Sequence, residues 1–143
     1  MIFERSGTTF VPRQALPHSS IILLCLAISE DKKDIFAGTN HSKLLVYRDN
    51  GTQFYLNQTI DIGFTLTLIH HIPHRLQVNG YSPNILFFED DGTMYRKTQN
   101  ITAEYSFVVE SVISRDFTHF AYAGFNRKMT MYEYSNGTYE IIE

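Results

Sequence analysis

Three histidines, His70, His71 and His74, lie close together and are the first candidates for chemistry, because imidazole is a common metal ligand. Neighbouring residues of a β-strand point to opposite faces of the sheet. His70 and His71 therefore cannot share a metal ion if this segment is a strand. His71 and His74 flank a turn that contains Pro73, and they would need a third ligand from elsewhere in the chain. The pattern favours polar turn residues over a metal site.

The acidic run Glu89-Asp90-Asp91 is the second candidate, either for calcium or for an acid pair. A calcium loop places its oxygen ligands at alternating positions over about 12 residues. These three carboxylates instead lead directly into Gly92, which predicts a hairpin turn. No nucleophile–base pair, phosphate-cradling loop or aromatic-studded basic surface is evident. We therefore expect no catalytic residue, no cofactor and no metal, and we expect the chain not to be an enzyme.

The elements that would position these residues are hairpins that recur along the chain. Asn50-Gly51 lies between two apolar runs, where both residues tolerate the positive φ of a type I′ turn. Similar hairpins are centred on Gly7, Gly92 and Gly137, so the turn glycines are spaced 44, 41 and 45 residues apart. A second series of predicted turn glycines, Gly38, Gly80 and Gly124, is spaced 42 and 44 residues apart and indicates the same register. A period of this length is typical of a repeat protein.

Each complete repeat contains four predicted strands, and no segment shows helical periodicity beyond a turn. The expected strands are 22–28, 35–38, 44–47 and 53–58, then 65–70, 76–79, 85–88 and 94–97, then 107–113, 119–123, 128–134 and 138–142. Near-continuous apolar runs at the first and third strands predict a sheet covered on both faces. Residues 1–10 read as the second half of a repeat, and residues 11–20, with two prolines, read as a loop.

These repeats resemble the WD40 family of β-propellers. Ser29-Glu30-Asp31 and Ser114-Arg115-Asp116 are similar to its Ser-Pro-Asp turn, although Trp and the Gly-His dipeptide are absent. Aromatic–polar pairs stand where its Trp-Asp dipeptide belongs: Phe3-Glu4, Tyr47-Arg48, Phe88-Glu89 and Tyr132-Glu133. The resemblance implies an all-β fold with a half blade (1–10), a loop (11–20) and three blades (21–61, 64–102 and 107–143). Tyr47, Phe88 and Tyr132 should hold equivalent buried positions between blades.

The resemblance also implies a non-catalytic scaffold that binds protein or peptide partners through its blade loops and faces. One alternative is a propeller-type hydrolase or carbohydrate-binding module, which would need acidic or arginine residues converging on one end of the central channel. Another alternative is a truncated gene product without a separate function. Three and a half blades predict an open arc with exposed edges, so we expect the isolated chain to self-associate or to need further blades.

Composition narrows the class of partner. The chain has 143 residues and a net charge of −3, and its twelve Lys and Arg residues are scattered, so neither nucleic acid nor membrane is expected to bind.

The apolar run 21–28 is too short to span a bilayer, which needs about 20 residues. It could form the core of a signal peptide, but apolar strands in the same phase of the later repeats favour a strand. We expect a cytoplasmic protein with Cys25 packed as a small hydrophobe.

Overall fold

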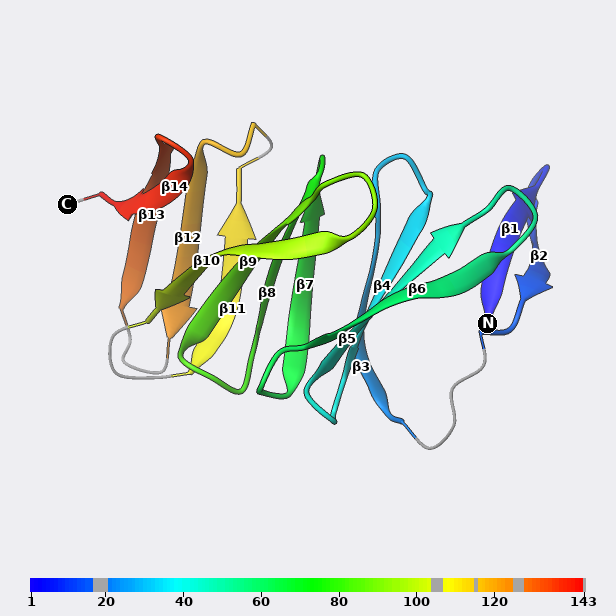
Figure 1. Ribbon diagram of the computed structural model, residues 1–143, viewed down its shortest axis with the longest axis horizontal. Helices are drawn as coiled ribbons and strands as arrows, with labels where there is room; N and C mark the ends of the chain where they lie inside the picture. Colours follow the sequence, from blue (N-terminus) through cyan, green and yellow to red (C-terminus); the bar gives the residue numbers. More distant parts are fainter. Residues whose placement is uncertain (17–20, 104–106, 115, 125–127, 143) are drawn as a thin grey trace.

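Each repeat folds into an antiparallel sheet whose strands follow one another in chain order, as tight turns between short apolar strands require (Figure 1). The computed structural model describes residues 1–16, 21–103, 107–114, 116–124 and 128–142. The half blade is β1 (Ile2–Ser6) and β2 (Thr9–Gln14). Blade 1 is β3 (Leu23–Ile28), β4 (Asp34–Thr39), β5 (Lys43–Asp49) and β6 (Phe54–Asp61). Blade 2 is β7 (Leu66–Ile72), β8 (Arg75–Gly80), β9 (Asn84–Asp90) and β10 (Tyr95–Thr102). Blade 3 is β11 (Val108–Ile113), β12 (His119–Gly124), β13 (Met129–Ser135) and β14 (Thr138–Ile141).

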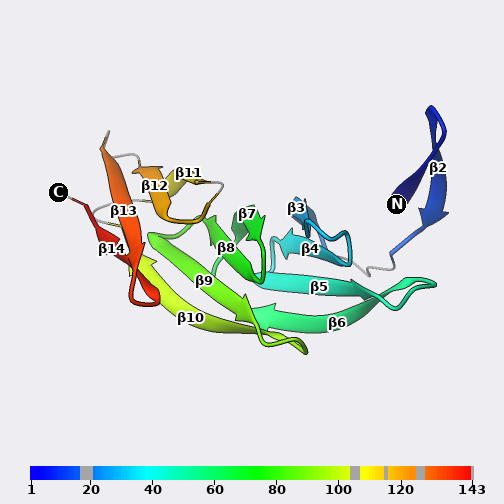
Figure 2. The same ribbon diagram turned by 90° about the horizontal axis from the view of Figure 1, so that it is seen from above.

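The blades stand side by side in an open arc. Figure 2 shows the first strands β3, β7 and β11 along the inner side of the curve and the fourth strands β6 and β10 along its outer side. The half blade stands beyond blade 1 at the N-terminal end, and blade 3 is at the other end. No helix in the described ranges is long and apolar enough to cross a membrane.

Apolar side chains fill the spaces between successive sheets rather than a single central core. The largest cluster joins blades 1 and 2 and includes Phe36, Leu66 and Phe88. A second, rich in aromatic rings, joins blades 2 and 3, and a smaller one lies between the half blade and blade 1. The equivalent rings of Tyr47, Phe88 and Tyr132 are 3%, 2% and 9% exposed, which confirms their predicted burial. Phe3, at the same position of the half blade, is 55% exposed.

Two predictions about the N-terminal third of the chain are wrong. The predicted loop at 11–20 is a strand up to Gln14, because β2 is an edge strand where Pro12 needs no N–H donor for a further neighbour. Residues 17–20 lie outside the described residues. The expectation that β3 is covered on both faces is also wrong, since Leu24, Leu26 and Ile28 are 44%, 65% and 61% exposed.

A repeated glutamine links each fourth strand to the next one. Its side-chain amide nitrogen donates to a backbone carbonyl, and its oxygen accepts from the backbone N–H of the same residue. The three pairs, here called the glutamine clamps, are Gln14 with Phe54 (2.7 and 2.8 Å), Gln58 with Tyr95 (2.9 and 2.8 Å) and Gln99 with Tyr139 (2.9 and 2.9 Å). Each clamp holds two neighbouring blades in one relative position at their outer edge.

The turn glycines Gly7, Gly51, Gly92 and Gly137 all have positive φ, between 63° and 93°. The type I′ prediction at Asn50-Gly51 is wrong, because Asn50 does not have positive φ and its side-chain oxygen instead accepts from the N–H groups of Thr52 and Gln53. Asp91 makes the same bonds before Met94. Of the described hairpins, only Asn136-Gly137 has positive φ at both central residues.

The second glycine series lies in strands rather than turns, with Gly38 in β4, Gly80 in β8 and Gly124 in β12. The three glycines are also not in one register. Gly80 and Gly124 lie opposite Leu66 and Val108, the first residues of β7 and β11, whereas Gly38 lies opposite Cys25 and so corresponds to Asn79. Gly80 is needed for a close approach, since a Cβ there would lie 1.9 Å from the Thr65 carbonyl oxygen. The equivalent positions Asp34 and Arg75 are 41 residues apart, whereas Gly38 and Gly80 are 42 residues apart. The difference of one residue is this offset.

Candidate functional site

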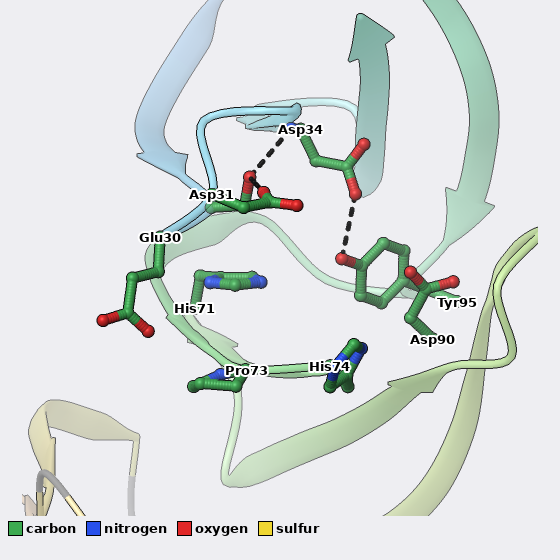
Figure 3. Close-up of a pocket in the computed structure, with 9 residues that line it drawn as sticks. Glu30, Asp31, Asp34, His71, Pro73, His74, Asp90 and Tyr95 are labelled. Atoms are coloured by element: carbon green, nitrogen blue, oxygen red, sulfur yellow. Dashed lines mark hydrogen bonds between the residues drawn. The ribbon is translucent and has the colours of Figure 1, made fainter.

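A cleft of about 340 Å³ opens between blades 1 and 2, where the β3–β4 and β7–β8 turns meet the β9–β10 hairpin. Figure 3 shows the lining residues around the opening, with His71 and His74 across from Asp34 and Tyr95. The set is rich in ionisable groups: Ser29, Glu30, Asp31, Asp34, His71, Pro73, His74, Asp90 and Tyr95. This end of the sheet is therefore acidic, with two imidazoles beside the carboxylates.

The wall of the cleft is held by an ion network centred on Arg48. Its guanidinium donates to both carboxylate oxygens of Asp34, at 2.9 and 3.0 Å, and to Asp90 of blade 2 at 3.2 Å. Asp34 is only 5% exposed, and it also accepts from the Tyr95 hydroxyl at 3.1 Å. Hydrogen bonding to Asp34 raises the pKa of Arg48, and burial raises the pKa of Tyr95 well above its usual range. Arg48 is therefore positively charged, and the Tyr95 hydroxyl keeps its proton.

The turn on the blade 1 side is built by Ser29 and Asp31. The Ser29 hydroxyl donates to Asp31 at 2.7 Å and accepts from the Asp34 N–H at 2.8 Å. The bond from Ser29 lowers the pKa of Asp31, together with a backbone bond from Lys33. Ser114 and Asp116 repeat this arrangement in blade 3, at 2.7 Å. The two Ser-x-Asp motifs therefore form equivalent turns, and Asp31 is a fixed carboxylate at the mouth of the cleft.

The histidines point to different blades, as the strand prediction required. His70 shares a hydrogen bond of 2.8 Å with the Ser111 carbonyl oxygen of blade 3. His71 stacks on Phe36 of blade 1, with ring centroids 5.2 Å apart, and its burial lowers its pKa. His74, exposed at a φ of 61°, lies at the turn. No group of three metal-ligating side chains occurs among the residues that the structure describes.

His71 also lines a second hollow of about 400 Å³ on the inner side of the arc, together with Glu30 and Pro73. Ile28 and Ile113, which end β3 and β11, complete this hollow with Ile72, Ser114 and Phe117. The acidic cleft therefore continues into the space beside the ends of all three first strands. Glu30 and His71, whose pKa is lowered by burial, line both hollows. This arrangement can accept hydrogen bonds from hydroxyl groups and can take a proton from water at neutral pH.

The polar members of the four aromatic–polar pairs carry a pattern that the sequence did not reveal. Arg48 lies opposite Asp34 in the neighbouring strand, whereas Glu89 lies opposite Arg75, and Glu133 lies opposite His119. Arg75 and Glu89 form an ion pair at 2.8 Å. The sign of the pair is thus inverted between blade 1 and blade 2. Glu4 of the half blade has no ion-pair partner among the described residues.

Solved structures similar to this one include gluconolactonases and a β-propeller domain, and the likeness is one of fold. No family model matches the sequence, and no curated protein matches it. A periplasmic gluconolactonase of Pseudomonas aeruginosa, PpgL, is 19% identical with a TM-score of 0.69, over 94% of this chain and 41% of its own. A putative 6-phosphogluconolactonase of Bacteroides uniformis is 15% identical with a TM-score of 0.72, over 94% of this chain and 46% of its own. The β-propeller domain of Myceliophteria thermophila Swd1 is 12% identical with a TM-score of 0.69, over 86% and 42%.

These comparisons contradict one expectation from the sequence and support another only in part. The chain spans less than half the length of the propellers that it matches. The expectation that the chain is not an enzyme is contradicted, because the gluconolactonases are enzymes with the same arrangement of blades. The WD40 resemblance is supported only to the level of the propeller fold, which Swd1 and a chain of the mitotic checkpoint complex share.

Proposed function

We propose that this chain is part of a propeller-type hydrolase that acts on a small polyhydroxylated ester, of which a sugar lactone is the model. The observation that carries the proposal is that Glu30, Asp31 and His71 line one cleft between blades 1 and 2. Such a cluster is what distinguishes a hydrolase or carbohydrate site from a plain scaffold on this fold. The gluconolactonase likeness supports the same class, by fold analogy.

In this proposal the residues have separate roles. Carboxylate oxygens of Glu30 and Asp31 accept hydrogen bonds from sugar hydroxyls, and Arg48 fixes the cleft wall through Asp34 and Asp90. His71, uncharged at neutral pH because burial lowers its pKa, accepts a proton as water adds to the lactone carbonyl carbon. The ring C–O ester bond then breaks, and the imidazolium returns that proton to the departing ring oxygen. The product is the open-chain hydroxy acid.

Hydrolysis of D-glucono-1,5-lactone by the full chain, followed in a pH-stat, tests this proposal. We expect a rate above that of buffer, which His71→Gln lowers at least tenfold. His41→Gln is the matched control, because His41 is exposed in the β4–β5 turn, at the opposite end of β4 from the cleft. The rate should fall on acidification, with its midpoint below the ordinary histidine pKa of about 6.5, because burial lowers the pKa of His71.

Binding of the product gluconate, followed through the His71 ring signals by NMR, makes the test independent of turnover. We expect gluconate at millimolar concentration to shift the His71 ring signals and not those of His41. The proposal is wrong if lactone disappears at the buffer rate and gluconate shifts neither ring.

Protein binding is a second candidate function. It is favoured by the exposed apolar row on β3, Leu24, Leu26 and Ile28, and by the WD40-like turns at Ser29-Glu30-Asp31 and Ser114-Arg115-Asp116. Large exposed apolar patches mark interaction surfaces in soluble proteins. This function can coexist with hydrolysis, because the row lies on the face of blade 1 that is directed at the half blade.

A further inference from the structure

The half blade is an incomplete sheet with an open edge. It has two strands, whereas each of the other three sheets has four. In those sheets the third strand pairs with the second: β5 with β4, β9 with β8 and β13 with β12. The strand at the third position of the half blade is β1, and it pairs only with β2. An edge of unpaired backbone N–H and C=O groups is a template for strand addition.

The side chains beside this edge are exposed for lack of a cover. Leu26 of β3 occupies the position of Ile69 in β7 and Ser111 in β11, since the three lie opposite Ala37, Val78 and Tyr122. Ile69 and Ser111 are 6% and 1% exposed, because they pack on the inner strands of the preceding blade, but Leu26 is 65% exposed.

An apolar groove of about 210 Å³ lies between the half blade and blade 1, and its lining includes Ile2, Leu26 and Ile28. The exposed row and this groove are in the place that two further inner strands would cover.

Charge identifies what the added strand must carry. Glu4 stands where Arg48, Glu89 and Glu133 stand, since each of the four follows the aromatic residue of its aromatic–polar pair. Their partners on the fourth strands are Val11, Tyr55, Arg96 and Glu140. The residue facing that position from the second strand is of opposite charge in blades 1 and 2, and it is a histidine, His119, facing Glu133 in blade 3. A strand added to β1 should therefore place a basic residue opposite Glu4.

The side chain two residues further along the added strand should be apolar. In blade 1 this position is Phe36, fully buried against blade 2 in the same cluster as Ile69. In blade 2 it is Gln77, whose amide donates to the polar Ser111 at 2.6 Å. The residue at this position therefore matches the polarity of the residue that it contacts on the following blade. On the added strand the residue at this position would contact Leu26, which is apolar, so it should be apolar too.

We propose that the half blade binds a β-hairpin from a partner segment by antiparallel strand addition to β1, with a basic residue opposite Glu4 and an apolar residue two positions later. A second copy of this chain does not supply it, because its second strands β4, β8 and β12 are already paired on both edges. The added hairpin completes a four-stranded blade and covers Leu26 and Ile28. This inference is independent of the proposed hydrolase.

A synthetic hairpin tests the proposal on the full chain. The peptide has the sequence of residues 22–40, which form the first two strands of blade 1, with Cys25→Ser to prevent oxidation and Asp34→Arg to supply the basic residue. Fluorescence anisotropy should show saturable binding of this peptide. The version that keeps Asp34 should bind about fivefold more weakly, as an exposed ion pair allows. Glu4→Arg in the chain should reverse that preference.

Leu26→Lys should weaken binding of the Asp34→Arg peptide at least tenfold without unfolding the chain, because Leu26 is exposed in the free protein. Ile141→Lys is the matched control, since Ile141 is 63% exposed on blade 3 and should leave binding unchanged. Light scattering of the chain alone completes the experiment. The proposal is overturned by absence of binding at millimolar peptide, by equal affinity of the two peptides, or by a dimer that Leu26→Lys and Glu4→Arg dissociate.

Discussion

Replacing Gln58 by alanine removes one complete glutamine clamp and measures how strongly blades 1 and 2 are held at their outer edge. The clamp consists of two hydrogen bonds with the Tyr95 backbone, at 2.9 and 2.8 Å. Each bond contributes about 0.5–1.5 kcal/mol net, so the loss should be ~1–3 kcal/mol. Tyr95 is 3% exposed, so water replaces the lost bonds poorly and the upper part of that range applies.

A loss of ~2–3 kcal/mol should lower the melting temperature by roughly 5–10 °C in a protein of this length. Circular dichroism of Gln58→Ala against the unchanged chain measures that shift. Gln53→Ala is the matched control, since Gln53 is exposed in the β5–β6 hairpin and changes the same side chain where no clamp exists. Gln14→Ala should release only the half blade, seen as faster amide exchange confined to β1 and β2. The reasoning is refuted if Gln58→Ala and Gln53→Ala melt at the same temperature.

Three further predictions concern single positions. Gly51→Val should cost roughly 1–3 kcal/mol in urea unfolding because φ at Gly51 is 93°, and Thr52→Ser should be near neutral; equal midpoints for the two would contradict the turn assignment. Phe88→Ala should cost ~3–5 kcal/mol and Phe3→Ala under ~0.5 kcal/mol, because the first ring is buried and the second exposed; equal costs would show that the half blade is covered. Burial raises the pKa of Cys25 to about 11, so the thiolate at pH 8 should be roughly 100-fold less populated than for a thiol with the ordinary pKa of 9.0. Iodoacetamide should therefore label Cys25 far more slowly in the folded chain than in urea. Similar labelling rates would contradict its burial.

The repeat and its strands could be predicted because turns impose a local requirement on sequence. Gly51 and Gly92 are visible as glycines since positive φ excludes most other residues, and their spacing then fixed the number of blades. The same reasoning failed at Gly38. A glycine is needed there because the Cys25 sulfur and the Leu66 side chain leave no room for a Cβ atom, and not because the chain turns. Local rules cannot separate those two causes.

Contacts between blades were hidden from the sequence for a different reason. Gln14, Gln58 and Gln99 are ordinary polar residues, and each makes its bonds with a residue 37–40 positions away. Their spacing of 44 and 41 residues repeats that of the turn glycines and could have revealed them. The cleft could not be found in this way. His71 and Asp34 meet only because blades 1 and 2 pack face to face, and no local pattern joins them.

The inverted sign of the cross-strand pairs has a consequence for folding. A repeat protein risks pairing the first half of one blade with the second half of another, because all its hairpins are alike. If β4 paired with β9, Asp34 would lie opposite Glu89, and pairing of β8 with β5 would set Arg75 against Arg48. Both errors bring like charges together, which is unfavourable in neighbouring strands. The charges of these pairs therefore disfavour the exchange of strands between blade 1 and blade 2 during folding.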